Sequence, residues 1–212
     1  MKKNKLLIAL AIAASSGVTL ADEDINYSFS LKDWNHTFKQ NRTSSQTNSP
    51  VLSATAKKGD YFVTTSFLMP ATYNFAGDSI TRRDSDLAAG WSFNSNFSLL
   101  GGYKVVNSYS YTNNAFTGNT DFKITYVGLN GFTSLNENSF LYGTFTRSLN
   151  VSKSNAASTD PKVTFTNYEA GYGYVLNKTT QLSLGYRSQT FDDTTSPKPV
   201  LAGLIFGVTL TQ

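Results

Sequence analysis

Apolar and polar residues alternate with a period of two over most of the chain. Between 97 and 111, for example, Phe97, Leu99, Tyr103 and Val105 alternate with small or polar residues. A period of two is typical of β-strands, because successive side chains point to opposite faces of a sheet. Beyond residue 21 no stretch has helical periodicity, and none has an apolar run of about 18 residues that would predict a transmembrane helix. The chain is therefore predicted to be all-β.

This alternation predicts ten strands, with eight as the alternative count. Clusters of Gly, Asn, Asp and Ser residues separate the alternating segments, as expected for turns. The predicted strands cover approximately residues 26–38, 50–57, 61–69, 84–93, 97–111, 121–131, 140–149, 163–175, 181–191 and 200–210.

Short and long connections alternate between these strands. The short ones are near 58–60, 94–96, 133–139 and 177–180, and the longer, more polar ones are near 39–49, 70–83, 112–120, 150–162 and 192–199. This order is typical of an up-and-down antiparallel barrel with short turns at one end and longer loops at the other. An even number of strands places both ends of the chain on the same side.

The predicted strands are long enough to cross a membrane. A membrane-crossing strand needs about 9–11 residues, and most of the ten segments reach that length. A bilayer also forbids unpaired backbone groups, and pairing the last strand with the first satisfies them. We therefore predict a transmembrane β-barrel. The alternative is a soluble, secreted β-sandwich such as an adhesin domain, which would have shorter strands of about 5–6 residues.

The N-terminus has the pattern of a secretory signal peptide. The basic segment MKKNK precedes the apolar segment LLIALAIAA, and small residues stand at Thr19 and Ala21. This order predicts cleavage after Ala21, because signal peptides end in such small residues. Residues 1–21 are accordingly predicted to be the signal peptide, and residues 22–212 a single barrel domain.

Composition supports a barrel wall and argues against a nucleic-acid partner. Charged residues make up 15% of the chain, aromatic residues 14%, and cysteine is absent. The charged fraction is low, because globular proteins usually have about 25%. The chain has 18 basic and 14 acidic residues, and the predicted signal peptide holds three of the basic ones, which leaves 15 against 14. So small a net charge indicates no nucleic-acid partner.

The chain resembles the small outer-membrane β-barrel proteins of Gram-negative bacteria. The resemblance rests on the N-terminal MKKNKLLIALAIAASSGVTLA, the alternating hairpins, and the final strand VLAGLIFGVTL. It implies location in the cell outer membrane, contact with outer-membrane lipid and lipopolysaccharide, and delivery by the barrel-assembly machinery. Such proteins usually end in a terminal aromatic residue, whereas this chain ends in TLTQ. Neither a cofactor nor a metal ion is expected.

A cluster of charged residues is predicted to point into the barrel. Alternation places them on the polar face of their strands, whereas the poor alternation around Lys123 and Arg147 leaves those two unassigned. Buried charges are stable only if they are paired or hydrated. The cluster is therefore either the lining of a narrow polar pore or a salt-bridged plug. Its predicted members are Asp84, Asp86, Lys104, Glu169 and Arg187.

His36, in the segment LKDWNHTF, is the only histidine and the only candidate catalytic base. Asp33 is close in sequence, but residues three apart on a strand point to opposite faces. Neither a G-x-S-x-G motif nor a metal-spaced histidine pair is present. We therefore predict no catalytic site. The alternative is a barrel enzyme that uses His36 on lipid, lipopolysaccharide or peptide.

The predicted role is a membrane scaffold, a narrow pore or a surface-loop interaction module. For the last of these, Tyr73, Phe75 and Phe116 are predicted to lie in loops, where a partner would contact them. The identity of such a partner is not indicated by the sequence.

The first strand raises a question of register. Tyr27, Phe29 and Leu31 are predicted to face outward, and the same parity directs Asp33 toward lipid. An acid facing hydrocarbon is costly. We therefore predict a break in regular strand pairing between Leu31 and His36.

Overall fold

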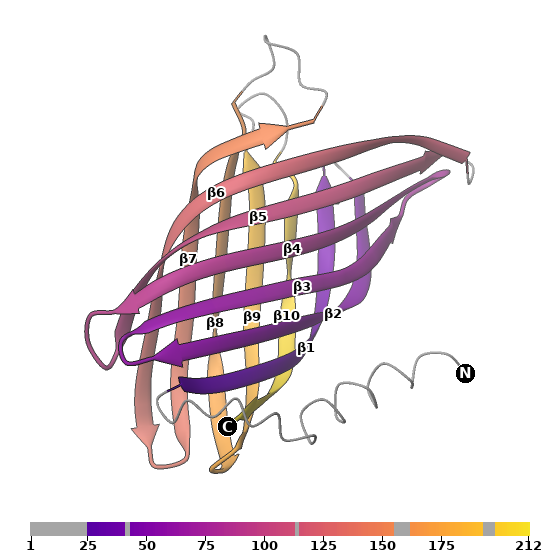
Figure 1. Ribbon diagram of the computed structural model, residues 1–212. Helices are drawn as coiled ribbons and strands as arrows, with labels where there is room; N and C mark the ends of the chain where they lie inside the picture. The colour runs from indigo at the N-terminus through magenta and orange to yellow at the C-terminus, as the bar shows by residue number, and fades with distance from the viewer. Residues whose placement is uncertain (1–24, 41–42, 113–114, 155–161, 193–197) are drawn as a thin grey trace.

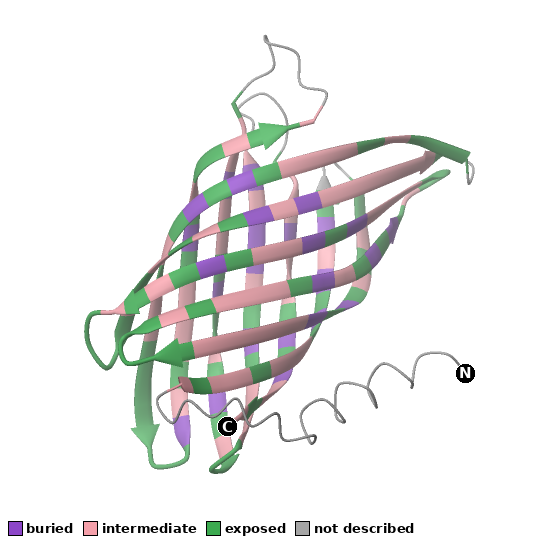
Figure 2. Cartoon of the chain, in the orientation of Figure 1, coloured by how far each residue is buried: buried purple, intermediate pink, exposed green. Residues whose placement is uncertain are grey.

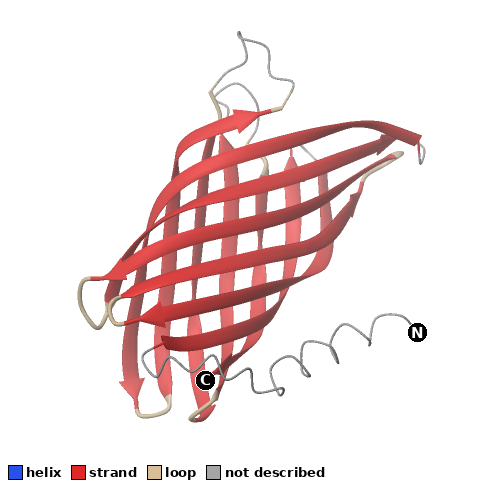
Figure 3. Cartoon of the chain, in the orientation of Figure 1, coloured by secondary structure: helices blue, strands red, loops and turns tan. Residues whose placement is uncertain are grey.

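The computed structural model describes residues 25–40, 43–112, 115–154, 162–192 and 198–212. These residues form ten strands and the connections between them, with no helix among them (Figure 3). Within the described ranges no helix is long and apolar enough to cross a membrane. The prediction of an all-β chain is confirmed, and the strand count is ten. The predicted signal peptide, residues 1–21, lies outside the described residues.

The ten strands follow one another directly along the chain. They are β1 (Ile25–Gln40), β2 (Thr43–Lys58), β3 (Tyr61–Asn74), β4 (Asp78–Ser92), β5 (Phe97–Thr112), β6 (Ala115–Asn136), β7 (Ser139–Lys153), β8 (Thr164–Asn177), β9 (Thr180–Asp192) and β10 (Val200–Thr211).

These strands form one closed barrel (Figure 1). Each strand pairs antiparallel with the next, and β10 pairs antiparallel with β1 from Ser28–Thr211 to Lys39–Val200. This is the predicted up-and-down order. The β-sandwich alternative is wrong, because a sandwich leaves sheet edges open and this sheet closes on itself. The end with the short turns at 59–60, 93–96, 137–138 and 178–179 is called the short-turn end, and the opposite end the loop end.

The register of the barrel is staggered. Starting at Ile25, we move from each residue to the residue paired with it on the next strand, through β2, β3 and onward to β10. This path returns to β1 at Thr37, twelve residues further along the chain than Ile25. Ten strands with this stagger tilt by about 40° to the barrel axis. Each step to the next strand in this direction therefore rises toward the loop end by about 1.2 residues, roughly 3 Å.

Several strands extend further toward the loop end than predicted. β2 begins at Thr43, β4 at Asp78 and β6 at Ala115, so much of the expected loops at 39–49, 70–83 and 112–120 is strand. Those segments are mostly polar, so the period of two is weak there although the backbone remains paired. The predictions for the loop aromatics change as well: Tyr73 is fully buried in β3 and Phe116 lies exposed in β6, whereas Phe75 lies in the connection between β3 and β4, as predicted.

The outward face of the barrel is an apolar band. Exposed and less exposed residues alternate along the strands in Figure 2. Soluble proteins rarely expose a continuous apolar surface of this extent, whereas membrane barrels present one to lipid. The exposed large apolar residues of the band include Phe29, Val63, Phe67, Leu87, Leu99, Tyr103, Val127, Leu129, Phe145, Tyr168, Tyr172, Leu184, Tyr186, Leu204 and Phe206.

The interior is not uniformly polar, because two apolar clusters also point inward. On β6, the apolar side chains of Ile124 and Tyr126 are buried inside the barrel rather than exposed to lipid. The first cluster contains Trp34, Phe38, Val51, Leu68, Ala71, Tyr73, Leu201 and Ile205, and the second Ala88, Val106, Ile124, Tyr126, Phe165 and Phe191.

The predicted break in β1 does not occur. Pairing is regular on both sides of β1 from Leu31 to His36, and Asp33 pairs with Pro50 of β2 and Phe206 of β10. The prediction was wrong about the backbone but right about parity: Asp33 is exposed on the outward face, whereas His36 is buried inside. The structure therefore accommodates an outward-facing acid without a bulge.

Candidate functional site: a charged belt across the lumen

The five charged residues predicted for the lumen all point inward, and each is held in an ion pair. Three of them are buried and two are partly buried, and they come from four strands. They are Asp84 and Asp86 on β4, Lys104 on β5, Glu169 on β8 and Arg187 on β9.

The most buried pair joins Arg82 to Asp84. The guanidinium donates from Nε to Oδ1 at 2.7 Å and from Nη2 to Oδ2 at 2.6 Å. The two residues are two apart on β4, so their side chains share the inward face. Their side chains are only 4% and 2% exposed. Two parallel hydrogen bonds of this kind fix the orientation of both side chains as well as pairing the charges.

Lys104 extends this group onto β5. Its Nζ lies 3.2 Å from Oδ2 of Asp84 and 3.4 Å from Oδ2 of Asp86. On β6, the hydroxyl of Tyr126 donates to Oδ1 of Asp86 at 2.5 Å. The two acids are therefore neutralised by two cations, and the charges alternate along the group.

A second group is centred on Glu169. Nζ of Lys32 donates to Oε1 at 2.6 Å. Oε2 accepts from Nε of Arg187 at 2.8 Å and from its Nη2 at 2.5 Å. The guanidinium of Arg187 also lies 5.4 Å from the ring centroid of Trp34, where a cation–π contact is favourable.

One hydrogen bond connects β4 with β9, five strands away around the ten-stranded barrel. Nη2 of Arg82 donates to Oε1 of Gln189 at 2.7 Å. Because half of the barrel separates these strands, this bond crosses the lumen. We call the whole arrangement the lumen belt; it comprises Lys32, Arg82, Asp84, Asp86, Lys104, Tyr126, Glu169, Arg187 and Gln189.

Two cavities adjoin the lumen belt. Toward the short-turn end, a cavity of about 240 Å³ has a mostly polar lining that includes Ser53, Thr64 and Asn130. Toward the loop end, a cavity of about 280 Å³ is lined by aromatic and aliphatic side chains, among them Phe122 and Phe191. Seven belt residues line the first cavity, which therefore lies beside the belt, whereas Arg82 is the belt residue that lines the second.

His36 is buried beside the belt, and both of its ring nitrogens are engaged. Nδ1 lies 2.8 Å from the carbonyl oxygen of Trp34 and Nε2 lies 2.6 Å from the hydroxyl of Tyr73. Because a carbonyl can only accept, Nδ1 carries the proton, and Nε2 accepts from the Tyr73 hydroxyl. The imidazole also stacks on the Trp34 ring at 4.0 Å and is 1% exposed. Asp33 lies on the opposite face, so the two do not form a dyad.

Replacing Tyr73 with phenylalanine is expected to lower the free energy of unfolding by about 1–3 kcal/mol, because Nε2 of His36 would be left buried without a donor. Urea unfolding in detergent micelles, followed by gel mobility, measures this change. Tyr109→Phe is the matched control, since its hydroxyl accepts from Arg83 on the exposed face. Equal effects of the two substitutions would contradict the assigned hydrogen bond.

Four members of the lumen belt were missed by the sequence analysis: Lys32, Arg82, Tyr126 and Gln189. Parity alone identifies Lys32, because it alternates with Leu31 and Asp33 on β1. Arg82 has the parity of Asp84 but fell within the predicted loop 70–83. The two charged residues that the sequence left unassigned, Lys123 and Arg147, are both exposed on the outward face.

Among the described residues, no group of three or more His, Asp or Glu side chains is arranged to hold a metal ion. The polar atoms of the lumen belt instead bind one another. Among the described residues, the lumen belt is thus a set of ion pairs and hydrogen bonds inside the barrel.

No protein-family model matches the sequence, and no curated protein matches it. Solved structures do match the fold. The outer-membrane protease OmpT from Escherichia coli matches with a TM-score of 0.56 and 12% identity, over 91% of this chain and 98% of that chain. The translocator domain of the autotransporter NalP from Neisseria meningitidis matches with a TM-score of 0.50 and 11% identity, over 98% of this chain and 95% of that chain.

At these identities the likeness concerns the fold, not the activity of either protein. It agrees with the closed ten-stranded barrel and with the apolar band that faces outward. The chain is therefore similar in fold to an outer-membrane protease and to an autotransporter translocator domain, both from Gram-negative bacteria.

Proposed function

We propose that this integral outer-membrane barrel is a non-enzymatic membrane scaffold whose lumen is closed by the lumen belt. The sequence left a narrow pore and a plug open as alternatives. The observation that favours closure is the hydrogen bond from Arg82 to Gln189, which joins the ion pairs on one side of the barrel to the opposite wall. The exposed band supports contact with outer-membrane lipid and lipopolysaccharide, and delivery by the barrel-assembly machinery belongs to the same proposal.

Closure follows from the strength of the contacts that an ion would have to displace. Hydrogen bonds to charged groups contribute about 1.5–3 kcal/mol each, and the lumen belt contains several of them in a poorly hydrated site. A passing ion would need to separate Arg82 from Gln189 or Glu169 from its two cations. Ten strands also leave little more space than eight, whose side chains already fill the interior.

The environment of His36 supports the non-enzymatic part of the proposal. Its proton-accepting nitrogen is already bonded to Tyr73, and neither side chain is exposed. A general base needs a free nitrogen within reach of its substrate. Peptide- or lipid-hydrolysing activity that disappears in a folded His36→Ala variant would overturn this part of the proposal.

Planar-bilayer recordings test closure. The protein is expected to insert without a stable open level, because the lumen belt blocks the path. Gln189→Ala removes the cross-lumen acceptor but leaves every ion pair in place, and brief openings are expected from it. Heat-modifiable gel mobility verifies that both proteins are folded before recording. A stable, sizeable open level in the unaltered protein would replace the scaffold proposal with the narrow pore.

A further inference from the structure

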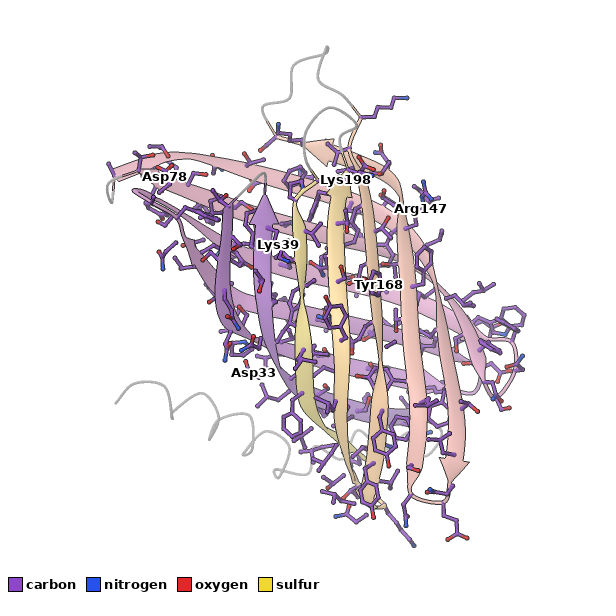
Figure 4. All side chains as sticks on the ribbon, turned by 180° about the vertical axis from the view of Figure 1, so that it is seen from behind. Asp33, Lys39, Asp78, Arg147, Tyr168 and Lys198 are labelled. Atoms are coloured by element: carbon purple, nitrogen blue, oxygen red, sulfur yellow. The ribbon has the colours of Figure 1, made fainter. Side chains whose placement is uncertain are left out.

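Two charged residues of opposite sign stand on the outward face, Asp33 on β1 and Arg147 on β7. Both are exposed. Among the described residues neither makes an ion pair or a hydrogen bond through its side chain. Figure 4 shows Asp33 on β1 and Arg147 on β7, with β10, β9 and β8 between them. Each is thus a lone charge directed to the barrel's surroundings.

The two charges lie at nearly the same depth. Pairing followed from Asp33 through β10, β9 and β8 reaches β7 at Leu141. Because of the stagger, each of these four steps from strand to strand moves about 1.2 residues toward the short-turn end, so Leu141 lies about five residues nearer that end than Asp33. Arg147 is six residues nearer the loop end than Leu141. The net difference is therefore about one residue, roughly 3 Å along the axis.

Both charges have apolar neighbours on the lipid-facing surface. Asp33 is paired with Phe206 and follows Leu31 on the outward face. Arg147 is paired with Val127 and follows Phe145, which is exposed. A charge on the lipid face of a barrel costs free energy that grows toward the middle of the bilayer.

Asp33 is the lowest member of a small polar patch. Asn35 on β1 is paired directly with Asn48 on β2, and both are exposed. We call Asp33, Asn35 and Asn48 the polar notch. It offers a carboxylate and the amide oxygen of Asn48 as acceptors, together with the second lone pair of the Asn35 amide oxygen, which already accepts from Nε2 of Gln46 at 2.8 Å. An arginine guanidinium offers five donors in one plane that fit a carboxylate bidentately.

We propose that Arg147 of one copy binds the polar notch of a second copy, so that the barrels associate side by side in the membrane. The complementary charges are at matching depth, so both chains keep the same orientation in the bilayer. Because the two surfaces differ and lie on different sides of the barrel, the contact is head to tail, and it generates rows or rings rather than two-fold dimers.

A lipid phosphate is the competing partner for Arg147. It would neutralise the guanidinium but not Asp33, because phosphate and carboxylate have charges of the same sign. A second copy satisfies both groups with one contact. This contact does not depend on the state of the lumen, so the bilayer recordings and the association test can fail separately.

Cysteine cross-linking in native membranes tests the geometry. The chain has no cysteine, so no background bridge forms. Two differently tagged copies are expressed together, one with Asn35→Cys and the other with Leu149→Cys, an exposed position two residues from Arg147. Mixed cross-links between the two tags are expected, with none between identical copies. Cross-links between two copies that both carry Asn35→Cys would overturn the head-to-tail arrangement.

Charge exchange tests the contact itself. Asp33→Arg or Arg147→Asp is expected to reduce the mixed cross-link about tenfold, since close interfacial charge pairs couple by at least that factor. The two reversals together should restore it. Asp33→Asn and Arg147→Gln test the same loss without placing a new charge in lipid. As a control for cross-links from random collisions, Leu149→Cys is replaced by Tyr103→Cys, at an exposed position on β5. An unchanged cross-link in the neutral variants would refute the proposal and leave lipid phosphate as the partner of Arg147.

Discussion

Replacing Arg82 with methionine is expected to lower the free energy of unfolding by about 3–5 kcal/mol. The substitution leaves Asp84 buried with only Lys104, which it shares with Asp86. It also removes the donor that bonds Oε1 of Gln189 at 2.7 Å. An uncompensated buried charge costs far more than the pair contributes, because the low-dielectric interior cannot solvate it.

Arg83→Met is the matched control for Arg82→Met. Arg83 is the next residue of β4, but it is exposed on the outward face and contacts Tyr109. We expect a change below about 1 kcal/mol from it, as for other exposed polar contacts. Adding Asp84→Leu to Arg82→Met removes both charges and should recover part of the lost stability. Urea unfolding of all variants provides the comparison, and equal losses from Arg82→Met and Arg83→Met would contradict a buried, coupled belt.

Replacing Gly203 with alanine is expected to cost about 1–3 kcal/mol or more, because it overpacks the seam where the barrel closes. Gly203 of β10 pairs with His36 of β1. A Cβ at this position would collide with the backbone carbonyl of Asn35 and would come within 2.6 Å of the Cα of His36. Backbone atoms of a paired strand cannot move aside as a side chain can, so the seam itself must shift.

Gly207→Ala is the control for Gly203→Ala, because it lies on the same strand and the same face. Its nearest contacts would be Cγ of Lys32 at 2.5 Å and Oγ of Ser183 at 3.1 Å, which are side-chain atoms that can move, and the backbone carbonyl of Leu31, at 3.2 Å, is further away than the carbonyl of Asn35 is from a Cβ at Gly203. A smaller loss is expected, seen as a larger heat-modifiable, folded fraction after refolding into micelles. If Gly207→Ala were the more damaging of the two, the seam at Gly203 would not be the tight point.

Parity made a large part of the structure predictable from sequence. Because side chains alternate strictly along a strand, one outward residue assigns a face to all its neighbours. That is why Asp33 was correctly directed outward and Trp34 and His36 inward, and why all five predicted lumen charges point inward. The strand number followed from turn residues, and the prediction of a closed barrel followed from the need to pair every strand edge in lipid.

The alternation of apolar and polar residues could not assign faces where a strand has few apolar residues. Toward the loop end β2 and β4 are mostly polar, so the alternation weakens before the strands end, and Arg82 was missed with the start of β4. The same limit hid Tyr73, which was taken for a loop residue and is the partner of His36. The predicted break in β1 was wrong for another reason: the cost of exposing Asp33 to lipid was assumed to be larger than the cost of disrupting backbone pairing.

The sequence by itself determined the strand pattern, the class of barrel and the face on which most side chains lie. Only the tertiary structure decided which inward side chains meet. Arg82 and Gln189 are 107 residues apart, and their contact depends on the number of strands and on the twelve-residue stagger. Parity is a local property of each strand, whereas depth and position around the lumen are properties of the closed barrel. The lumen belt therefore exists only once β10 has paired with β1.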